Sequence, residues 1–169
     1  MEPKGDIALI GLAVMGQNLI LNMNDHGFTV CAFNRTVSKV DDFLANEAKG
    51  TKVIGAQSIE DLMGKLKKPR RVVMLVKAGQ AVDDFIEKIL PFTEEGDIII
   101  DGGNSLFTDS IRRTHYLEGK KRLCECAAKV CVVGICNEGR HRRANRARGS
   151  KQKLARGTSN EVSWMQTTY

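Results

Sequence analysis

The sequence lacks the features that would assign it to a membrane or to a secretory route. No stretch approaches the roughly eighteen consecutive apolar residues that a transmembrane helix needs. The opening residues, Met-Glu-Pro-Lys-Gly-Asp, are not a basic segment followed by an apolar run, so they do not resemble a secretory signal. These absences predict a cytoplasmic protein without membrane association, in which the five cysteines are expected to be reduced.

Acidic residues are scarce in one part of the chain. The formal net charge of +6 over 169 residues divides into −3 for residues 1–118 and +9 for residues 119–169. Residues 139–156 hold eight lysines and arginines, no acid and no apolar periodicity. We therefore predict a folded domain over residues 1–118 and a basic tail over residues 119–169. The tail has too little apolar surface to offset its ordering entropy, so disorder is expected, apart from one additional strand that could form near 130–135.

The tail also lacks the patterns that would give it a ligand. Its arginines could neutralise nucleic-acid phosphates, but no aromatic side chains for base stacking are interleaved with them. Its cysteines at 124, 126, 131 and 136 could bind zinc with His141, yet they contain no C-x2-C pair. The sequence thus favours neither a nucleic-acid partner nor a metal. An out-of-frame or alternatively spliced C-terminus would explain the abrupt change in composition.

Short apolar runs alternate with amphipathic segments along the first 118 residues. The apolar runs predict strands near 6–10, 29–33, 51–54, 71–76 and 98–101, and helical periodicity lies at 15–25, 37–47, 58–66 and 81–90. Strands of this apolar, β-branched kind suit a parallel sheet that is covered on both faces. The pattern predicts an α/β fold with a Rossmann-like, doubly wound parallel sheet.

A glycine-rich turn joins the first strand to the first helix. Gly11 allows the sharp turn, and Gly16 allows the helix to lie close to the strand. Ala13 stands where the generic G-x-G-x-x-G pattern has its second glycine, and it is small enough for a phosphate to approach the backbone. The arrangement predicts a dinucleotide whose pyrophosphate binds the backbone N–H groups at the helix N-terminus.

The end of the second strand lacks the carboxylate that accepts hydrogen bonds from the ribose of NAD. Asn34, Arg35 and Thr36 stand there instead, and the arginine offers planar, permanently charged donors to a phosphate. This favours NADP as the cofactor. Helix capping is the alternative role, since Thr36 and Ser38 both precede the helix and Ser38 opens an S-x-x-D pattern. Both interpretations can hold together.

Two further loops follow strands and should meet the glycine turn at the same edge of the sheet. In Val76-Lys77-Ala78-Gly79, the lysine could place a cation near the cofactor or be an ordinary exposed side chain. In Asp101-Gly-Gly-Asn104-Ser105, the asparagine could orient a hydroxyl or carboxamide, or could serve only the turn. Ser105 could be the N-cap of a helix that begins near residue 106.

Taken together, these motifs resemble the NADP-binding domain of the 6-phosphogluconate dehydrogenase family, from about residue 6 to residue 113. The resemblance implies oxidative decarboxylation of 6-phosphogluconate to ribulose 5-phosphate with NADP in the pentose phosphate pathway. It implies that Asn104 contacts both nicotinamide and substrate. The cofactor-binding residues that it implies, together with the two glycines, are Gly11, Ala13, Val14, Met15, Gly16, Asn34, Arg35, Thr36, Val76, Lys77, Ala78 and Asn104.

The resemblance also implies residues that this sequence does not match. The family's catalytic lysine and glutamate belong to a following helical domain that supplies most of the homodimer contact, so no catalytic residue is assigned and we expect this chain to be inactive alone. The family's Ser-Gly-Gly substrate loop is also unmatched. A non-catalytic NADP-binding fragment or isoform is one alternative. Another 3-hydroxyacid dehydrogenase is a second, although such enzymes usually carry an Asp-x-Ser-Thr loop where this chain has Asp-Gly-Gly-Asn-Ser.

Overall fold

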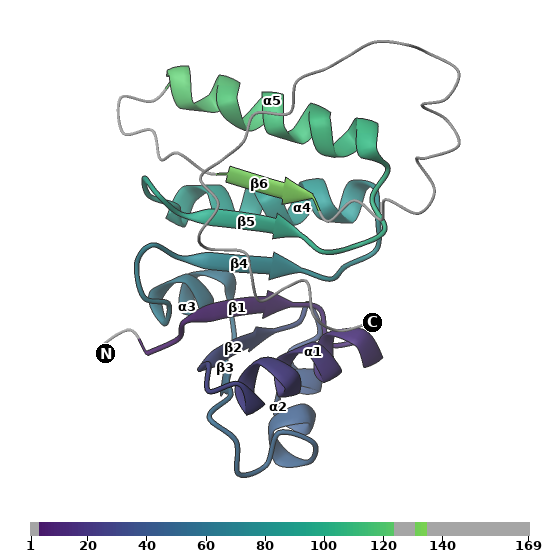
Figure 1. Ribbon diagram of the computed structural model, residues 1–169, viewed down its shortest axis with the longest axis vertical. Coiled ribbons are helices and arrows are strands. Elements are labelled where there is room, and N and C mark those ends of the chain that lie inside the picture. The colour runs from purple at the N-terminus through teal and green to yellow at the C-terminus, as the bar shows by residue number, and fades with distance from the viewer. Residues whose placement is uncertain (1–3, 124–130, 135–169) are drawn as a thin grey trace. The chain divides into compact units, whose positions relative to one another are not determined.

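Six parallel strands form one sheet in a computed structural model, which describes residues 4–123 and 131–134 (Figure 1). The strand order is β3-β2-β1-β4-β5-β6, so the chain winds outward from β1 and then returns to place β4 on the other side of β1. This is the doubly wound arrangement, and the predicted fold class is confirmed. The strands are β1 (Ile7–Ile10), β2 (Val30–Phe33), β3 (Ile54–Gly55), β4 (Arg71–Met74), β5 (Ile98–Asp101) and β6 (Cys131–Gly134).

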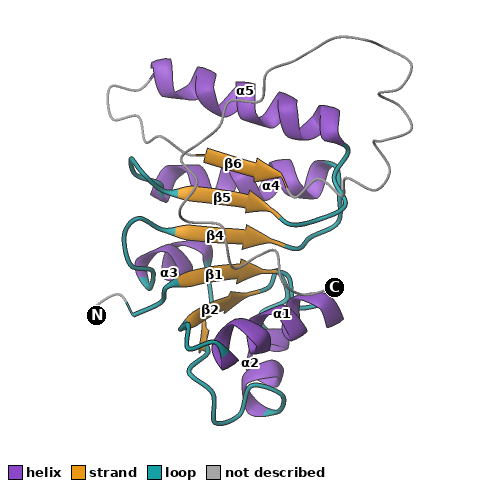
Figure 2. Ribbon diagram, viewed as in Figure 1, coloured by secondary structure: helices purple, strands orange, loops and turns teal. Residues whose placement is uncertain are grey.

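Helices cover both faces of the sheet (Figure 2). They are α1 (Val14–Asp25), α2 (Ser38–Ala45), α3 (Ile59–Gly64), α4 (Gln80–Ile89) and α5 (Phe107–Leu123), with a 3-10 turn η1 (Leu90–Phe92) after α4. Alternate side chains of β1 belong to two separate apolar clusters. Ile7 and Leu9 pack with residues of α1 and α2, whereas Ala8 and Ile10 pack with residues of α3 and α4. Burial on both faces explains why the strands read as continuous apolar runs.

The register places the carboxyl ends of the central strands at one level. Ile10 at the end of β1 is paired with Phe33 of β2 and with Met74 of β4. Met74 is paired in turn with Asp101, the last residue of β5. The loops that follow these four strands therefore emerge at the same edge of the sheet, as predicted from the alternation of strands and helices.

Two predicted helix caps differ from the structure. Ser38 is the first residue of α2, the N-cap position belongs to Val37, and no side chain caps this helix. Ser105 is not the N-cap residue of α5. The backbone N–H groups of Asp109 and Ser110 donate to the carbonyl oxygen of Leu106, the residue just before the helix, and the Ser105 hydroxyl accepts from Arg113. The S-x-x-D pattern at Ser58 is a real cap: the Ser58 hydroxyl accepts from the backbone N–H of Asp61 at 3.0 Å.

The third strand is shorter and later than predicted. Residues 51–53 lie in a turn that follows Gly50, whose φ of 81° redirects the chain. The backbone N–H of Lys52 donates to the side-chain oxygen of Asn24 and not to a carbonyl oxygen of a neighbouring strand. Pairing with β2 therefore begins only at Ile54, opposite Cys31.

The predicted boundary after residue 118 falls within α5, which continues to Leu123, and β6 lies within the range where an additional strand was predicted. The division into residues 1–118 and 119–169 stays a prediction. The basic run at 139–156 and the cysteines at 124, 126 and 136 lie outside the described residues, as do the predictions made for them. No helix in the described part is long and apolar enough to cross a membrane. The same residues contain no cluster of potential metal ligands.

Candidate functional site

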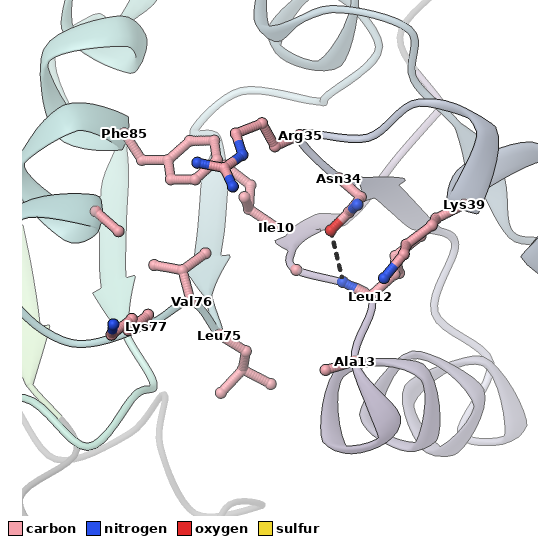
Figure 3. A pocket seen from close by; sticks show the side chains of 12 residues that line it. Ile10, Leu12, Ala13, Asn34, Arg35, Lys39, Leu75, Val76, Lys77 and Phe85 are labelled. Atoms are coloured by element: carbon pink, nitrogen blue, oxygen red, sulfur yellow. Dashed lines mark hydrogen bonds between the residues drawn. The ribbon is translucent and has the colours of Figure 1, made fainter.

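Loops after β1, β2 and β4 surround an open pocket of about 290 Å³ at the carboxyl edge of the sheet (Figure 3). We call them the glycine loop (residues 11–13), the β2–α2 loop (residues 34–37) and the β4–α4 loop (residues 75–79). Residues of α2 and α4 complete the walls. The lining residues are Ile10, Gly11, Leu12, Ala13, Asn34, Arg35, Lys39, Leu75, Val76, Lys77, Ala81 and Phe85.

The pocket brings together half of the predicted cofactor residues, namely Gly11, Ala13, Asn34, Arg35, Val76 and Lys77. The other half lies beside it. Val14 and Met15 are exposed at the start of α1, Gly16 is buried beneath the glycine loop, and Thr36 and Ala78 are exposed next to lining residues. Asn104 is exposed in the loop after β5 and does not line this pocket. A cofactor-binding role for each of these residues stays a prediction.

Glycine is required at two points of the turn. Gly11 has a φ of 112°, and a Cβ there would lie 2.2 Å from the carbonyl oxygen of Leu75. A Cβ on Gly16 would lie 1.9 Å from the carbonyl oxygen of Gly11. The lack of a side chain at Gly11 allows the chain to pass close to Leu75, just after β4, under the pocket. The lack of one at Gly16 allows α1 to lie against the turn. These approaches agree with the turn and packing roles expected from the sequence.

The N-terminus of α1 is open toward an anion. Its N-cap residue, Ala13, is extended with φ −85° and ψ 176°, and alanine has no side-chain acceptor for the first helical N–H groups. The first turn of the helix carries no acidic residue that could compensate for this. The backbone donors and the positive end of the helix dipole are thus available for a phosphate group.

Asn34 joins the glycine loop to the β2–α2 loop. Its side-chain oxygen accepts from the backbone N–H of Leu12 at 3.2 Å (Figure 3). Its side-chain nitrogen donates to the carbonyl oxygen of Thr36 at 3.1 Å. The sequence suggested Asn34 as a direct phosphate ligand. In the structure its amide holds two walls of the pocket at a fixed spacing, a role that sequence spacing alone does not indicate because Leu12 lies 22 residues away.

Three cations line the pocket, and no carboxylate is among the residues that line it. Arg35 and Lys39 lie on the α2 side, and Lys77 lies on the β4 side (Figure 3). Within the described part of the chain, none of these three side chains forms a hydrogen bond or an ion pair, and no carboxylate lines the pocket. Lys39 is not among the residues that the sequence motifs indicated. Its position in the first turn of the helix that follows Arg35 is the signal that could have found it.

The glycine turn, the open helix N-terminus and the basic second loop on a doubly wound sheet define a dinucleotide-binding domain. Comparison with known families makes the assignment specific. The model of the NAD binding domain of 6-phosphogluconate dehydrogenase matches residues 6–125, and the chain belongs to this family.

Relatives with curated names agree with the family. The chain is 77% identical over 117 residues to the decarboxylating 6-phosphogluconate dehydrogenase of Mus musculus and 75% identical over 117 residues to that of Homo sapiens. Each match covers 69% of this chain and 24% of the relative, so the chain spans about a quarter of the length of these proteins.

Solved structures show the same likeness. The 6-phosphogluconate dehydrogenase of Plasmodium falciparum, described in apo form and with its cofactor NADP+ or its substrate, matches with a TM-score of 0.65 and 42% identity. This match covers 76% of this chain and 27% of the other. The 3-hydroxyisobutyrate dehydrogenase of Mycobacterium tuberculosis matches with a TM-score of 0.59 and 19% identity over 77% of this chain and 39% of the other, which shows a shared fold.

Proposed function

We propose that this chain binds NADP or NADPH in the pocket at the carboxyl edge of the sheet. The pyrophosphate would accept hydrogen bonds from the N-terminus of α1, and the 2′-phosphate would lie between Arg35 and Lys39. The observation that carries the proposal is this pair of cations, which have no ion-pair partner in the described part of the chain, beside a loop without a carboxylate. A 2′-phosphate supplies the missing negative charge, whereas the 2′-hydroxyl of NAD does not.

The placement of the two cations supports this choice. Arg35 follows the end of β2 by two residues, and Lys39 is the second residue of α2. Both side chains are exposed, so a phosphate can reach them without displacing an existing ion pair. A guanidinium binds two phosphate oxygens at once, and the Lys39 ammonium supplies a second positive charge from α2.

For the nicotinamide half, we propose Val76, Lys77 and Ala78 on one side and Asn104 on the other. The asparagine side chain has both a donor and an acceptor, so it can bond the nicotinamide carboxamide or a substrate hydroxyl. The Plasmodium falciparum protein is described in complex with its cofactor NADP+ and in complex with its substrate, which supports the proposed ligands. We further propose the reaction of that family, in which 6-phosphogluconate would be oxidised with NADP+ as the hydride acceptor and would lose CO2 to give ribulose 5-phosphate.

Nucleotide titration calorimetry tests cofactor choice directly. Arg35→Ala should weaken NADP+ binding by roughly 1.5–3 kcal/mol, or about ten- to a hundredfold, because a charge-assisted contact is lost. NAD+ binding should change little. Lys49→Ala is the matched control, since it removes one exposed positive charge outside the pocket. Equal weakening of NADP+ and NAD+ by Arg35→Ala would remove Arg35 as the selector.

A turnover assay separates the two functional interpretations that the sequence leaves open. Steady NADPH formation from 6-phosphogluconate and NADP+ by the 169-residue chain would identify a complete catalytic unit. NADP+ binding without turnover would identify a nucleotide-binding unit that requires other residues for catalysis. Homodimerisation and a cytoplasmic location remain proposals derived from the sequence and from the family.

A further inference from the structure

Arg113 is a buried arginine that the proposed cofactor contacts do not use. It lies on α5, its side chain is 1% exposed, and its guanidinium bonds groups on four segments of the chain. Burial of a full charge is costly unless the charge is paired and its donors are satisfied. The structure supplies two carboxylates for this purpose, Asp83 on α4 and Asp101 at the end of β5.

One side of the guanidinium holds the end of the β4–α4 loop. Its Nη2 donates to the carbonyl oxygen of Gly79 at 3.0 Å and to Asp83 at 3.2 Å, while Nε donates to Asp83 at 2.8 Å. Gly79 is the N-cap residue of α4 and has a φ of 93°. Arg113 therefore fixes the point at which the loop that carries Lys77 turns into its helix.

The other side of the guanidinium holds the β5–α5 loop (residues 102–106) around Asn104. Its Nη1 lies 3.5 Å from Asp101 Oδ2 and 3.4 Å from Ser105 Oγ. The second oxygen of Asp101 accepts from the backbone N–H of Gly103 at 3.1 Å. The residues immediately before and after Asn104 are thus both tied, directly or through one carboxylate, to Arg113.

The two loops that Arg113 joins approach each other closely. A Cβ on Gly103 would lie 3.1 Å from the carbonyl oxygen of Val76. We propose that Arg113 is a positioning residue, which sets the spacing between the β4–α4 loop and Asn104 and so shapes the surface beside the pocket where the nicotinamide half of the cofactor would lie. This inference rests on the proposed NADP site. The adenosine half is built from other segments and does not depend on Arg113.

The neighbouring arginine provides a matched control. Arg112 also bonds Asp83, at 2.9 Å, but its side chain is 54% exposed. It forms ion pairs with Asp83 and Asp109, and neither belongs to the β4–α4 loop or to the β5–α5 loop. Arg112→Gln therefore removes a charge and an Asp83 contact while leaving the joined loops intact.

Calorimetry with two ligands tests the proposal: NADP+, and adenosine 2′,5′-bisphosphate, which lacks the nicotinamide half. Arg113→Lys replaces the planar guanidinium, which bonds both loops, with a single ammonium group, and it should weaken NADP+ binding by about tenfold. Its affinity for adenosine 2′,5′-bisphosphate should stay within about twofold of the wild type. Arg112→Gln should leave both affinities unchanged. A general loss of folding would lower both affinities together, so the split between the ligands distinguishes positioning from stability.

Ser105→Ala is a milder second variant for the case in which Arg113→Lys does not fold. It removes one contact to the β5–α5 loop, keeps both ion pairs, and should weaken NADP+ binding alone. Equal effects on both ligands, or no effect on NADP+, would overturn the positioning role. A wild-type chain that binds neither ligand would refute the proposed function itself, and this inference with it.

Discussion

Gly16 shows how a single hydrogen atom in place of a side chain builds the site. The helix can lie against the glycine turn only because nothing occupies the Cβ position, which is 1.9 Å from the carbonyl oxygen of Gly11. That oxygen belongs to the backbone and cannot move aside as a flexible side chain could. The sequence predicted this approach correctly, because the spacing from Gly11 to Gly16 carries the information.

Gly16→Ala should lower the free energy of unfolding by about 1–3 kcal/mol or more, as expected for overpacking against backbone. Gly64→Ala is the opposite control. Gly64 is exposed at the end of α3, and a Cβ there meets nothing within 4 Å, so alanine should stabilise by about 0.4–1 kcal/mol. Urea denaturation of both variants measures the difference. A Gly16→Ala chain as stable as the wild type would contradict the close approach of helix and turn.

Asn34 allows cofactor preference and loop spacing to be separated. Asn34→Asp keeps an acceptor for the N–H of Leu12 but loses the donor to Thr36 and adds a negative charge beside Arg35. We expect NADP+ affinity to fall about tenfold or more while NAD+ affinity is retained. Asn34→Ala removes both side-chain hydrogen bonds of this residue without adding charge, and it should weaken the binding of both nucleotides. Fluorescence titration with NADPH and NADH would detect the contrast, and equal losses in the two variants would contradict it.

At the scale of elements, the sequence predicted the strands and helices that local residue patterns determine. It did not predict the features that depend on contacts between residues far apart in the chain. Apolar runs gave the strands, and helical periodicity gave α1 to α4 within a few residues. An S-x-x-D pattern marks a helix cap at Ser58 but not at Ser38, where one was predicted, because the same residue pattern does not fix where the chain enters a helix. The contacts of Arg113 span up to 34 residues, and no spacing rule connects them.

The ion pair between α4 and α5 should make stability depend on pH. Hydrogen bonds from Arg113, and secondarily from Arg112, hold the pKa of Asp83 below its ordinary value of 3.8 despite partial burial. A lowered pKa in the folded state means that the carboxylate contributes stability above pH 3.8. That contribution is lost as the pH falls through the pKa of the folded state.

Asp83→Asn should therefore be less stable than the wild type near neutral pH and should lose less stability on acidification. Unfolding free energies measured by denaturant titration from about pH 6 down to about pH 3 give the two slopes. The variant should have the flatter curve at the acidic end. Parallel curves for the two proteins would show that the link between α4 and α5 does not depend on the charge of Asp83.

At the scale of the molecule, the pocket exists only when the central sheet is assembled. Its walls follow β1, β2 and β4, and the register of these strands sets the level at which each loop emerges. A nucleotide that bridges these loops binds the folded domain and has no equivalent site on the unfolded chain. Binding and folding are then linked, and the strength of the link is set by the nucleotide concentration relative to its dissociation constant.

NADP+ at about a hundred times its dissociation constant should add about 2.7 kcal/mol to the free energy of unfolding. The same concentration of NAD+ should add less, because it offers no 2′-phosphate to Arg35 and Lys39. Thermal unfolding followed by circular dichroism measures both, and the shift with NADP+ should shrink in Arg35→Ala. An equal shift in unfolding temperature with NAD+ and NADP+ would mean that the β2–α2 loop and Lys39 do not contribute to the preference between the two nucleotides. No shift with either nucleotide would mean that the assembled sheet edge does not bind a dinucleotide.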